Sequence, residues 1–335
     1  MRLLLLLFTL AVSATGFAQS RGENVYEFLN LGTSARIAAL GGDQVIVNDA
    51  DADFSFYNPS QLRASQSEYI SANYLNYLSD INLAYASYVK DFNKLGTFSI
   101  AMHYANYGDF TETDEYGQKI GNFKASDYAL LISYGRQLGK QFRIGASLKT
   151  IYSSLERYNS YGLAIDLALT YKSQDSLFQA ALVARNFGFQ IEPYYGSNTE
   201  DLPKEVLLGL SAKMANAPLQ FMLTYRHLEE FDLTYNSTIT DDSGINSSSD
   251  LIDKTLRHMV LGIEFLPSKN LSIRAGYNFQ RREELKVEEK TSTVGLTWGL
   301  GLKVGGFNLS YASARYHLAG TSHHFSVSTS LNNFL

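Results

Sequence analysis

The sequence predicts an all-β fold, in which about 14 antiparallel strands close into a transmembrane β-barrel around a short N-terminal, partly helical lumenal plug. Two observations carry this prediction. Apolar residues alternate with small or polar ones along many segments after residue 66, and the connections alternate between tight turns and long polar loops. A third observation agrees, because no segment after Ala18 is apolar for long enough to cross a membrane as a helix.

The first residues have the pattern of a secretory signal peptide. Arg2 provides a charged start, an apolar run follows, and the small residues Gly16 and Ala18 precede a cleavage site. The apolar run is too short for a membrane anchor. We therefore expect a signal peptide at residues 1–18, a plug or hatch segment at 19–66 and a barrel at 67–335, located in the bacterial outer membrane.

The composition excludes several classes of protein. The 335 residues contain no cysteine, so a disulfide framework, a thiol nucleophile and a cysteine metal site are excluded. The formal net charge of −5 argues against nucleic acid as a partner. Tyrosine and phenylalanine number 23 and 20 while proline numbers 5, which favours long strands.

The sequence shows no recognised pattern of catalytic or metal-binding residues. Its 6 histidines have no known ligand spacing, and neither a Gly-x-Ser-x-Gly elbow nor a phosphate-binding glycine loop occurs. We therefore expect no catalytic residue, no metal, no cofactor and no enzyme activity. A surface enzyme with a site assembled from distant loop residues is the alternative that a sequence leaves open.

The clearest alternation runs from Tyr161 to Tyr171, where aromatic and aliphatic residues share one face. At about 3.3 Å per residue and about 40° tilt, these two tyrosines lie roughly 25 Å apart along the membrane normal. This separation matches the two aromatic girdles of an outer-membrane barrel, and Phe142 and Tyr152 repeat it. The opposite face is rich in small residues and is expected to line the lumen, together with the charged residues Arg143, Lys149, Asp166, Arg185, Arg226 and Glu264.

The alternative fold is a secreted soluble β-sandwich or propeller, which also alternates and also follows a signal peptide. Two features argue against it. The small-residue face lacks the lysine and glutamate of water-exposed strands, and about 14 long strands exceed one sandwich. In the barrel, the predicted long loops cover residues 106–125, 188–203, 229–254 and 280–291.

Residues 19–66 do not alternate and are expected to close the barrel from inside. A helical composition extends from Thr33 to Leu40, with Thr33 or Ser34 as N-cap and the glycine pair after Leu40 as the end. Arg36 on this helix would need a partner if buried. We expect it to pair with a plug or lumen carboxylate such as Asp53 or Asp166.

The plug segment resembles the start of the PorQ family, outer-membrane proteins of the type IX secretion system. That family is similar to PorV and to the FadL group of fourteen-stranded barrels, in which an Asn-Pro-Ala turn ends a lumenal hatch; here Ser60 replaces that alanine. The fold implied by the resemblance is a barrel of FadL type. The plug motif that carries it comprises Phe28, Leu29, Leu31, Ser34, Arg36, Leu40, Gly41, Gly42, Asn58 and Pro59.

The PorQ resemblance implies a non-enzymatic scaffold of the cell-surface attachment (sortase) complex. The implied partners are a PorZ-like peripheral surface protein, PorU-like and PorV-like subunits, and outer-membrane lipid including lipopolysaccharide. The alternative is a FadL-like outer-membrane transporter of hydrophobic small molecules. Transport would need an apolar pocket between hatch and wall with an opening toward the lipid, whereas a lumen filled by the plug would favour the scaffold.

Two acidic segments invite further interpretations. Asp49, Asp51 and Asp53 have the spacing of the first EF-hand ligands, but Phe54 and Ser60 replace the required glycine and glutamate, so turn and capping roles are expected. The predicted loop at 229–254 is strongly acidic and is a candidate docking site for a basic partner; alternatively it is only a soluble surface loop. Its acidic residues are Glu229, Glu230, Asp232, Asp241, Asp242, Asp250 and Asp253.

Overall fold

The computed structural model describes residues 24–47, 49, 51–233, 247–285, 293–317 and 320–334, of which residues 247–250, 285, 316 and 317 are described by their backbone alone. The expected signal peptide at 1–18 and the docking-loop residues Asp241 and Asp242 lie outside the described residues. The side chain of Asp250 also lies outside them. No helix in the described ranges is long and apolar enough to span a membrane.

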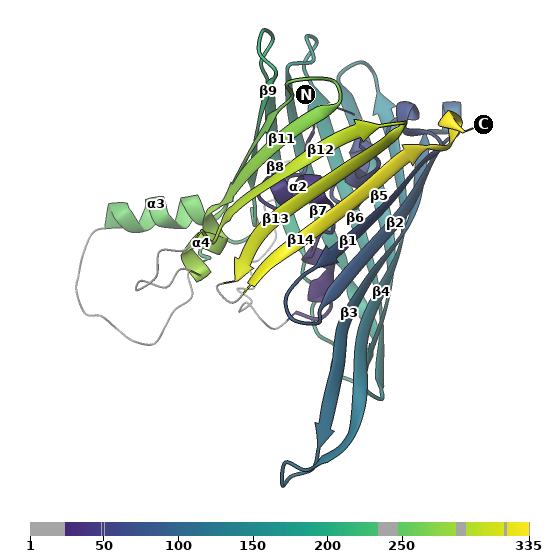
Figure 1. Cartoon of the computed structure of the whole chain (residues 1–335), viewed down its shortest axis with the longest axis vertical. Helices are drawn as coiled ribbons and strands as arrows, with labels where there is room; N and C mark the ends of the chain where they lie inside the picture. The colour runs from purple at the N-terminus through teal and green to yellow at the C-terminus, as the bar shows by residue number, and fades with distance from the viewer. Residues whose placement is uncertain are drawn as a thin grey trace, which may run out of the picture.

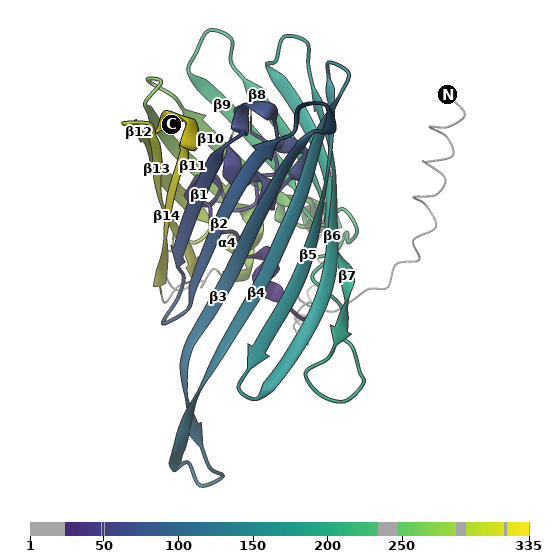
Figure 2. The same cartoon turned by 90° about the vertical axis from the view of Figure 1, so that its right-hand side faces the viewer.

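Within the described ranges, fourteen antiparallel strands form one closed barrel, in which each strand pairs with the next and β1 pairs with β14 (Figures 1 and 2). The predicted fold class is therefore confirmed. The strands are β1 (Tyr69–Asn76), β2 (Asn82–Asp91), β3 (Thr97–Thr113), β4 (Lys119–Leu138), β5 (Phe142–Leu155), β6 (Tyr158–Lys172), β7 (Phe178–Glu192), β8 (Glu205–Lys213), β9 (Leu219–Tyr225), β10 (Met259–Phe265), β11 (Leu271–Asn278), β12 (Leu296–Val304), β13 (Phe307–His317) and β14 (Gly320–Ser330).

The outer face of the barrel is apolar. Along β6, Ile165 and Leu167 are 45% and 58% exposed, whereas their neighbours Ala164 and Asp166 are each 1% exposed. The same alternation recurs along the other strands and continues around the closed wall. Large aliphatic side chains turned away from the protein on every second position need an apolar surrounding, which a bilayer provides.

Aromatic side chains form a row at each end of this apolar belt. Tyr104, Tyr128, Tyr152 and Tyr161 lie opposite one another on β3 to β6, with ring centroids 4.8, 6.0 and 5.1 Å apart in turn. At the other end, Phe98 contacts Tyr134 and Phe142 contacts Tyr171, at 5.0 and 5.3 Å. The four residues expected at the girdles are thus cross-strand neighbours, Tyr161 opposite Tyr152 and Tyr171 opposite Phe142.

Several predicted loops contain regular structure. β3 and β4 continue as a paired hairpin through residues 106–125 and project beyond the wall (Figure 2). Stacked Phe110 and Phe123, with ring centroids 5.1 Å apart, support this extension. The segment lies outside the apolar belt and mixes polar with scattered apolar residues, so its strands show no regular hydrophobic alternation. β7 likewise extends into 188–203, and α3 (Ser247–Arg257) and α4 (Phe279–Leu285) occupy parts of the last two loops.

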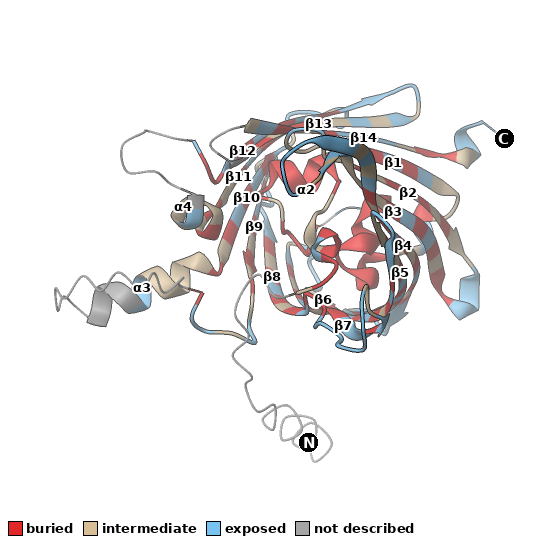
Figure 3. Cartoon of the chain, turned by 90° about the horizontal axis from the view of Figure 1, so that it is seen from below, coloured by how far each residue is buried: buried red, intermediate tan, exposed pale blue. Residues whose placement is uncertain are grey.

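The plug lies inside the lumen and passes from one end of the barrel to the other (Figure 3). At the long-loop end, the Val25 N–H donates to the Asp201 carbonyl, and at the tight-turn end the Glu68 N–H donates to the Val89 carbonyl. Its elements are short because they follow the shape of the lumen. They are η1 (Glu27–Asn30), α2 (Ala35–Ala39), η2 (Ala52–Phe56), η3 (Pro59–Gln61) and η4 (Ala64–Gln66).

The helix predicted after Ser34 forms, but its predicted side-chain cap does not. Ser34 stands at the N-cap position without a cap bond from its hydroxyl. Instead the Ala35 N–H donates to Oγ of Ser326 on β14, at 2.8 Å, so the barrel wall satisfies the helix start. The helix ends as predicted, since Gly41 and Gly42 have φ of 104° and 101°, values that favour glycine.

The membrane-facing surface can be tested with a charge. Leu167 lies near the middle of the apolar belt, so L167R should destabilise the barrel by about 2 to 4 kcal/mol in lipid. T111R, on the exposed hairpin of β3 and β4, is the matched control and should leave stability unchanged. The measurement is denaturant unfolding in phospholipid vesicles, and equal stability of both variants would contradict the assignment of the outer face.

Candidate functional site

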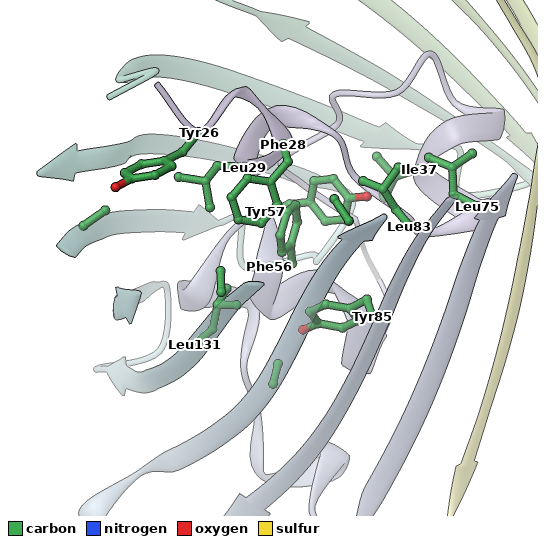
Figure 4. Packing of buried hydrophobic residues seen from close by; sticks show 14 of the residues in the cluster. Tyr26, Phe28, Leu29, Ile37, Phe56, Tyr57, Leu75, Leu83, Tyr85 and Leu131 are labelled. Carbon is green, nitrogen blue, oxygen red and sulfur yellow. The ribbon is translucent and has the colours of Figure 1, made fainter. Parts of the chain in front are cut away.

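The plug packs a hydrophobic cluster chiefly against the strands β1 to β6 (Figure 4). Phe28 and Leu29 are 1% exposed and Phe54 is fully buried. The ring of Phe56 lies 5.0 Å from Tyr57, 5.6 Å from Tyr85 and 4.9 Å from His103. Aromatic contacts between plug and wall therefore fill this half of the lumen.

Glycines of the wall allow the plug backbone to approach closely. A Cβ atom at Gly276 of β11 would lie 2.1 Å from the Gly41 nitrogen, and one at Gly145 of β5 would lie 2.2 Å from the Ser60 nitrogen. Any larger residue would force the plug to move. The small-residue face predicted for the lumen is thus explained by contact with the plug.

Arg36 of α2 joins the plug to the strands β10 and β11. Its Nη2 donates to Glu264 Oε2 at 2.6 Å, and its Nη1 lies 2.8 Å from Asp49 and 3.2 Å from Asp51. The other oxygen of Glu264 accepts from Nε of Arg274 at 2.7 Å. Glu264 is fully buried and Arg36 is 6% exposed, so each charge depends on its partners.

A second ionic cluster holds the chain just after α2. Asp43 accepts from Nη1 of Arg226 at 2.9 Å and lies 3.5 Å from both Arg185 and Arg281. Glu205 of β8 bridges two of these cations, accepting from Arg185 Nε at 2.9 Å and from Arg226 Nε at 2.8 Å. Three arginines from distant parts of the sequence thereby converge on one plug carboxylate.

A third buried cluster lies between β5, β6 and β7. Nζ of Lys149 contacts Asp166 at 2.8 Å and donates to Asn186 Oδ1 at 2.7 Å. Asn186 sits at a bulge of β7 with φ of 59°, and its amide reaches Oδ1 of the plug residue Asn30 at 3.0 Å. The bulge therefore aims one side chain at both the buried lysine and the plug.

The predicted Asn-Pro turn anchors the plug to β6. Asn58 Oδ1 accepts from the Ser60 N–H at 2.9 Å, and Pro59 occupies the first position of η3. The Ser60 hydroxyl lies 2.6 Å from the hydroxyl of Thr170. The serine that replaces the alanine of the FadL-type turn thus gains a hydrogen bond to the wall.

The named partners expected for Arg36 were wrong, although the expected kind of partner is present. Asp166 lies in the Lys149 cluster, and Asp53 lies against Ser71 and Asn73 of β1. Arg36 instead pairs with Asp49, Asp51 and Glu264. Sequence could place Glu264 in the lumen, but only the path of the plug determines which lumen carboxylate the helix meets.

The three aspartates have separate roles. Asp49 pairs with Arg36, and Asp51 Oδ1 accepts from the Asp53 N–H at 3.1 Å, which is the capping role expected of this segment. Burial, followed by the charge of Asp51, raises the pKa of Asp53 to about 7. No group of three or more metal-ligating side chains occurs among the residues that the structure describes.

A polar cavity of about 260 Å³ lies between the plug and the strands β10 to β14, toward the tight-turn end. Its lining includes Arg36, Asp53 and Arg274 from the site described above and the hydroxyls of Ser310 and Ser328. Charged and hydroxyl groups dominate its walls. It suits water or a polar solute better than a hydrocarbon.

Among the described acidic residues of the predicted docking loop, three form ion pairs at the long-loop end. Glu229 Oε1 lies 2.9 Å from His227 Nδ1, Asp232 lies 2.9 Å from Lys254, and Asp253 lies 2.9 Å from Arg257. These contacts thus offset part of the acidic charge locally in the described part of the loop. Glu230 is partly exposed and follows a turn at His227.

Three residues of the site carried no specific sequence signal. Asp43 and Arg281 lie outside regular alternation, and Glu205 is the first residue of its strand. By contrast, the inward parity of Arg185, Arg226 and Glu264 placed them in the lumen. The alternation of a regular strand shows which of its charged residues face the lumen. The positions of charged residues in the plug and the loops can be read only from the tertiary structure.

Comparisons with solved structures identify the architecture. The toluene transporter TbuX of Ralstonia pickettii is similar with a TM-score of 0.54 at 11% identity, covering 90% of this chain and 98% of that one. The toluene transporter TodX of P. putida gives 0.54 at 13% identity, covering 90% and 99%, and a Pseudomonas aeruginosa FadL homologue gives 0.50 at 12%, covering 89% and 97%.

The fold is a FadL-type outer-membrane barrel. These structural likenesses cover nearly the whole chain, but identities of 11% to 13% establish the fold alone. No protein-family model and no curated protein matches the chain. The resemblance to PorQ stays a hypothesis, as do the plug motif and the docking loop as functional sites.

The Arg36 cluster can be tested by removing one charge. E264Q leaves Arg36 and Arg274 without their shared buried counter-charge, so it should destabilise the protein by about 3 to 5 kcal/mol. D109N removes the partner of Lys124 in an exposed pair and should change stability by less than about 1 kcal/mol. Denaturant unfolding of the purified barrel measures both, and a small effect of E264Q would show that the cluster does not hold the plug.

Asp53 should make stability depend on pH. The pKa of Asp53 is raised in the folded state, so between about pH 4 and about pH 7 the folded state holds a proton that the unfolded state has lost. The free energy of unfolding therefore falls as the pH rises through this range, and it stays at the lower value above about pH 7. The loss is at most about 4 kcal/mol, at about 1.4 kcal/mol per pKa unit. D53N should lack it and gain stability relative to the wild type at pH 8 but little at pH 4. Parallel pH profiles of unfolding for the two proteins would contradict the assignment.

Proposed function

We propose that this protein is a plugged outer-membrane barrel that acts as a non-enzymatic binding platform through its long-loop end. The observation that carries the proposal is the plug, which fills the lumen and is tied to the wall by ionic and hydrogen-bonded clusters at Arg36, Asp43 and Asn30. A barrel built in this way keeps a rigid shape. Rigid scaffolds suit surfaces that bind partners, because little order is lost on binding.

The long-loop end offers the material for such a surface. The hairpin of β3 and β4 projects beyond the wall, and α3 and α4 stand beside the mouth (Figure 1). The exposed residues Tyr116 and Ile120 at the hairpin tip are 80% and 61% exposed. Exposed aromatic and aliphatic side chains on a rigid support are typical anchors of protein interfaces.

The PorQ resemblance supplies the specific form of this proposal. In that form, the protein is a scaffold of the attachment complex of the type IX secretion system. Its partners would be a PorZ-like peripheral protein and PorU-like and PorV-like subunits at the lipopolysaccharide surface. The support is the plug motif, since the comparisons add nothing for this secretion system.

The platform proposal is tested by affinity purification from native outer membranes after mild cross-linking. The full-length protein should recover a stoichiometric set of surface proteins. A variant whose hairpin residues 109–124 are replaced by a short turn should recover at least about tenfold less of one partner, a loss of about 1.4 kcal/mol in binding. Recovery of no stoichiometric partner by the full-length protein would overturn the proposal.

Passage of small hydrophobic molecules is the second candidate, and the comparisons favour it over the scaffold. Two of the similar structures are toluene transporters, and they share the fold over about nine tenths of this chain. Transport here would require the plug to move, because it occupies the lumen. The polar lining of the described cavity would also have to be bypassed by a hydrocarbon.

A disulfide lock separates the two candidates. The hydroxyls of Ser60 and Thr170 are 2.6 Å apart, and the chain has no other cysteine, so S60C with T170C should join plug and wall on oxidation. Transport predicts that toluene uptake into proteoliposomes falls on oxidation and recovers on reduction. The platform predicts no uptake above empty vesicles in either state, with partner recovery unchanged by the lock.

A further inference from the structure

The helix α3 leaves the barrel sideways. It begins after the long-loop end of β9 and its last residue, Arg257, lies two positions before β10. Two perpendicular views show it pointing away from the wall, across the direction of the barrel axis (Figures 1 and 3). A helix with this direction lies roughly parallel to the plane of the membrane that the barrel crosses.

The polar side of α3 faces the protein. Lys254 pairs with Asp232 of the preceding loop at 2.9 Å, with its side chain 20% exposed. Arg257 pairs with Asp253 at 2.9 Å and lies 3.9 Å from Glu283 of α4, with its side chain 15% exposed. Ionic contacts therefore attach this helix to the barrel, where surface helices usually use their apolar side.

The apolar side of α3 faces away from the protein. Leu251 and Ile252 are 54% and 62% exposed, and at 100° per residue they share one half of the helix with Thr255 and Leu256. Nearby in the same loop, Phe231 is 59% exposed. A soluble surface helix would not turn its aliphatic half to water, so this half needs an apolar surrounding.

The base of α3 adjoins an outward aromatic residue at the end of a strand. His258, directly after Arg257, stacks on Tyr225 with ring centroids 4.7 Å apart. Tyr225 ends β9 on the outward parity that carries Phe221 and Leu223 toward lipid. Outward aromatic residues at strand ends lie at the membrane interface. A helix that starts there and extends sideways meets the headgroup region of the outer leaflet.

We propose that α3 is an interfacial helix that rests on the lipid surface, with Leu251 and Ile252 inserted at the boundary between headgroups and acyl chains. Amphipathic helices of this kind bury their apolar side about 5 to 10 Å into that boundary. The lipid replaces the protein core that the aliphatic half lacks. The inference holds for either proposed function, because it concerns how the loop meets the bilayer.

The test uses the absence of cysteine in the chain, which makes single nitroxide labels specific. L251C and I252C probe the apolar side of the helix, and E115C on the hairpin tip serves as the water-exposed control. The full-length variants are labelled and placed in vesicles of phosphatidylcholine with phosphatidylglycerol. Relaxation is measured with oxygen, which concentrates in lipid, and with a polar nickel complex, which stays in water.

Oxygen should dominate at 251 and 252, and nickel at 115. In detergent-free lipid nanodiscs the same agent should dominate at each site. A cooperative unfolding transition on heating verifies that each labelled variant is folded. Nickel dominance at 251 and 252 would overturn the proposal. Protection of these two sites that arises only when native outer-membrane proteins are added would also overturn it, because a protein partner would then cover the helix.

Discussion

The structure depends on ion pairs that join buried charges of the plug to buried charges of the wall. A buried guanidinium or carboxylate that lost its partner in the lumen would lose much of its hydration without compensation. Glu264 shows the consequence, since its two oxygens serve Arg36 of the plug and Arg274 of the wall. In the second cluster, Arg226 likewise donates to both Asp43 of the plug segment and Glu205 of the wall. The plug position follows from this matching as much as from hydrophobic packing.

The wall and the plug are consequently complementary in both size and charge. Where the plug backbone passes close to the wall, as at Gly41 and Ser60, the wall offers Gly276 and Gly145. Where the plug carries Arg36 and Asp43, the wall and its loops offer the opposite charge. A pore for free diffusion needs neither feature, so the lumen of this barrel is organised around its own N-terminal segment rather than around water.

Prediction from the sequence succeeded where a two-residue alternation of apolar and small or polar side chains runs along a whole strand. Alternation identified the strands, the outward position of Tyr161 and Tyr171, and the inward position of Arg226 and Glu264. It missed the hairpin of β3 and β4, because strands wet on both faces lose the contrast between faces. It also missed which carboxylates meet Arg36 and the helix α3 within an acidic loop. Those facts depend on where the plug turns and on which side of a helix meets the protein, and neither is a property of local sequence.

The end-to-end path of the plug has a consequence for assembly. Its last residues continue directly into β1, and β1 closes the cylinder only by pairing with β14, the final strand of the chain. Segments packed against β6 and β11 at Thr170 and Gly276 lie too close to the wall to slide freely along a closed lumen. We therefore expect the plug to occupy the interior while the sheet is still open, and the β1 and β14 seam to enclose it on forming. The order of the chain, with the plug before the strands and the closing strand β14 at the end, suits a barrel that forms around its plug.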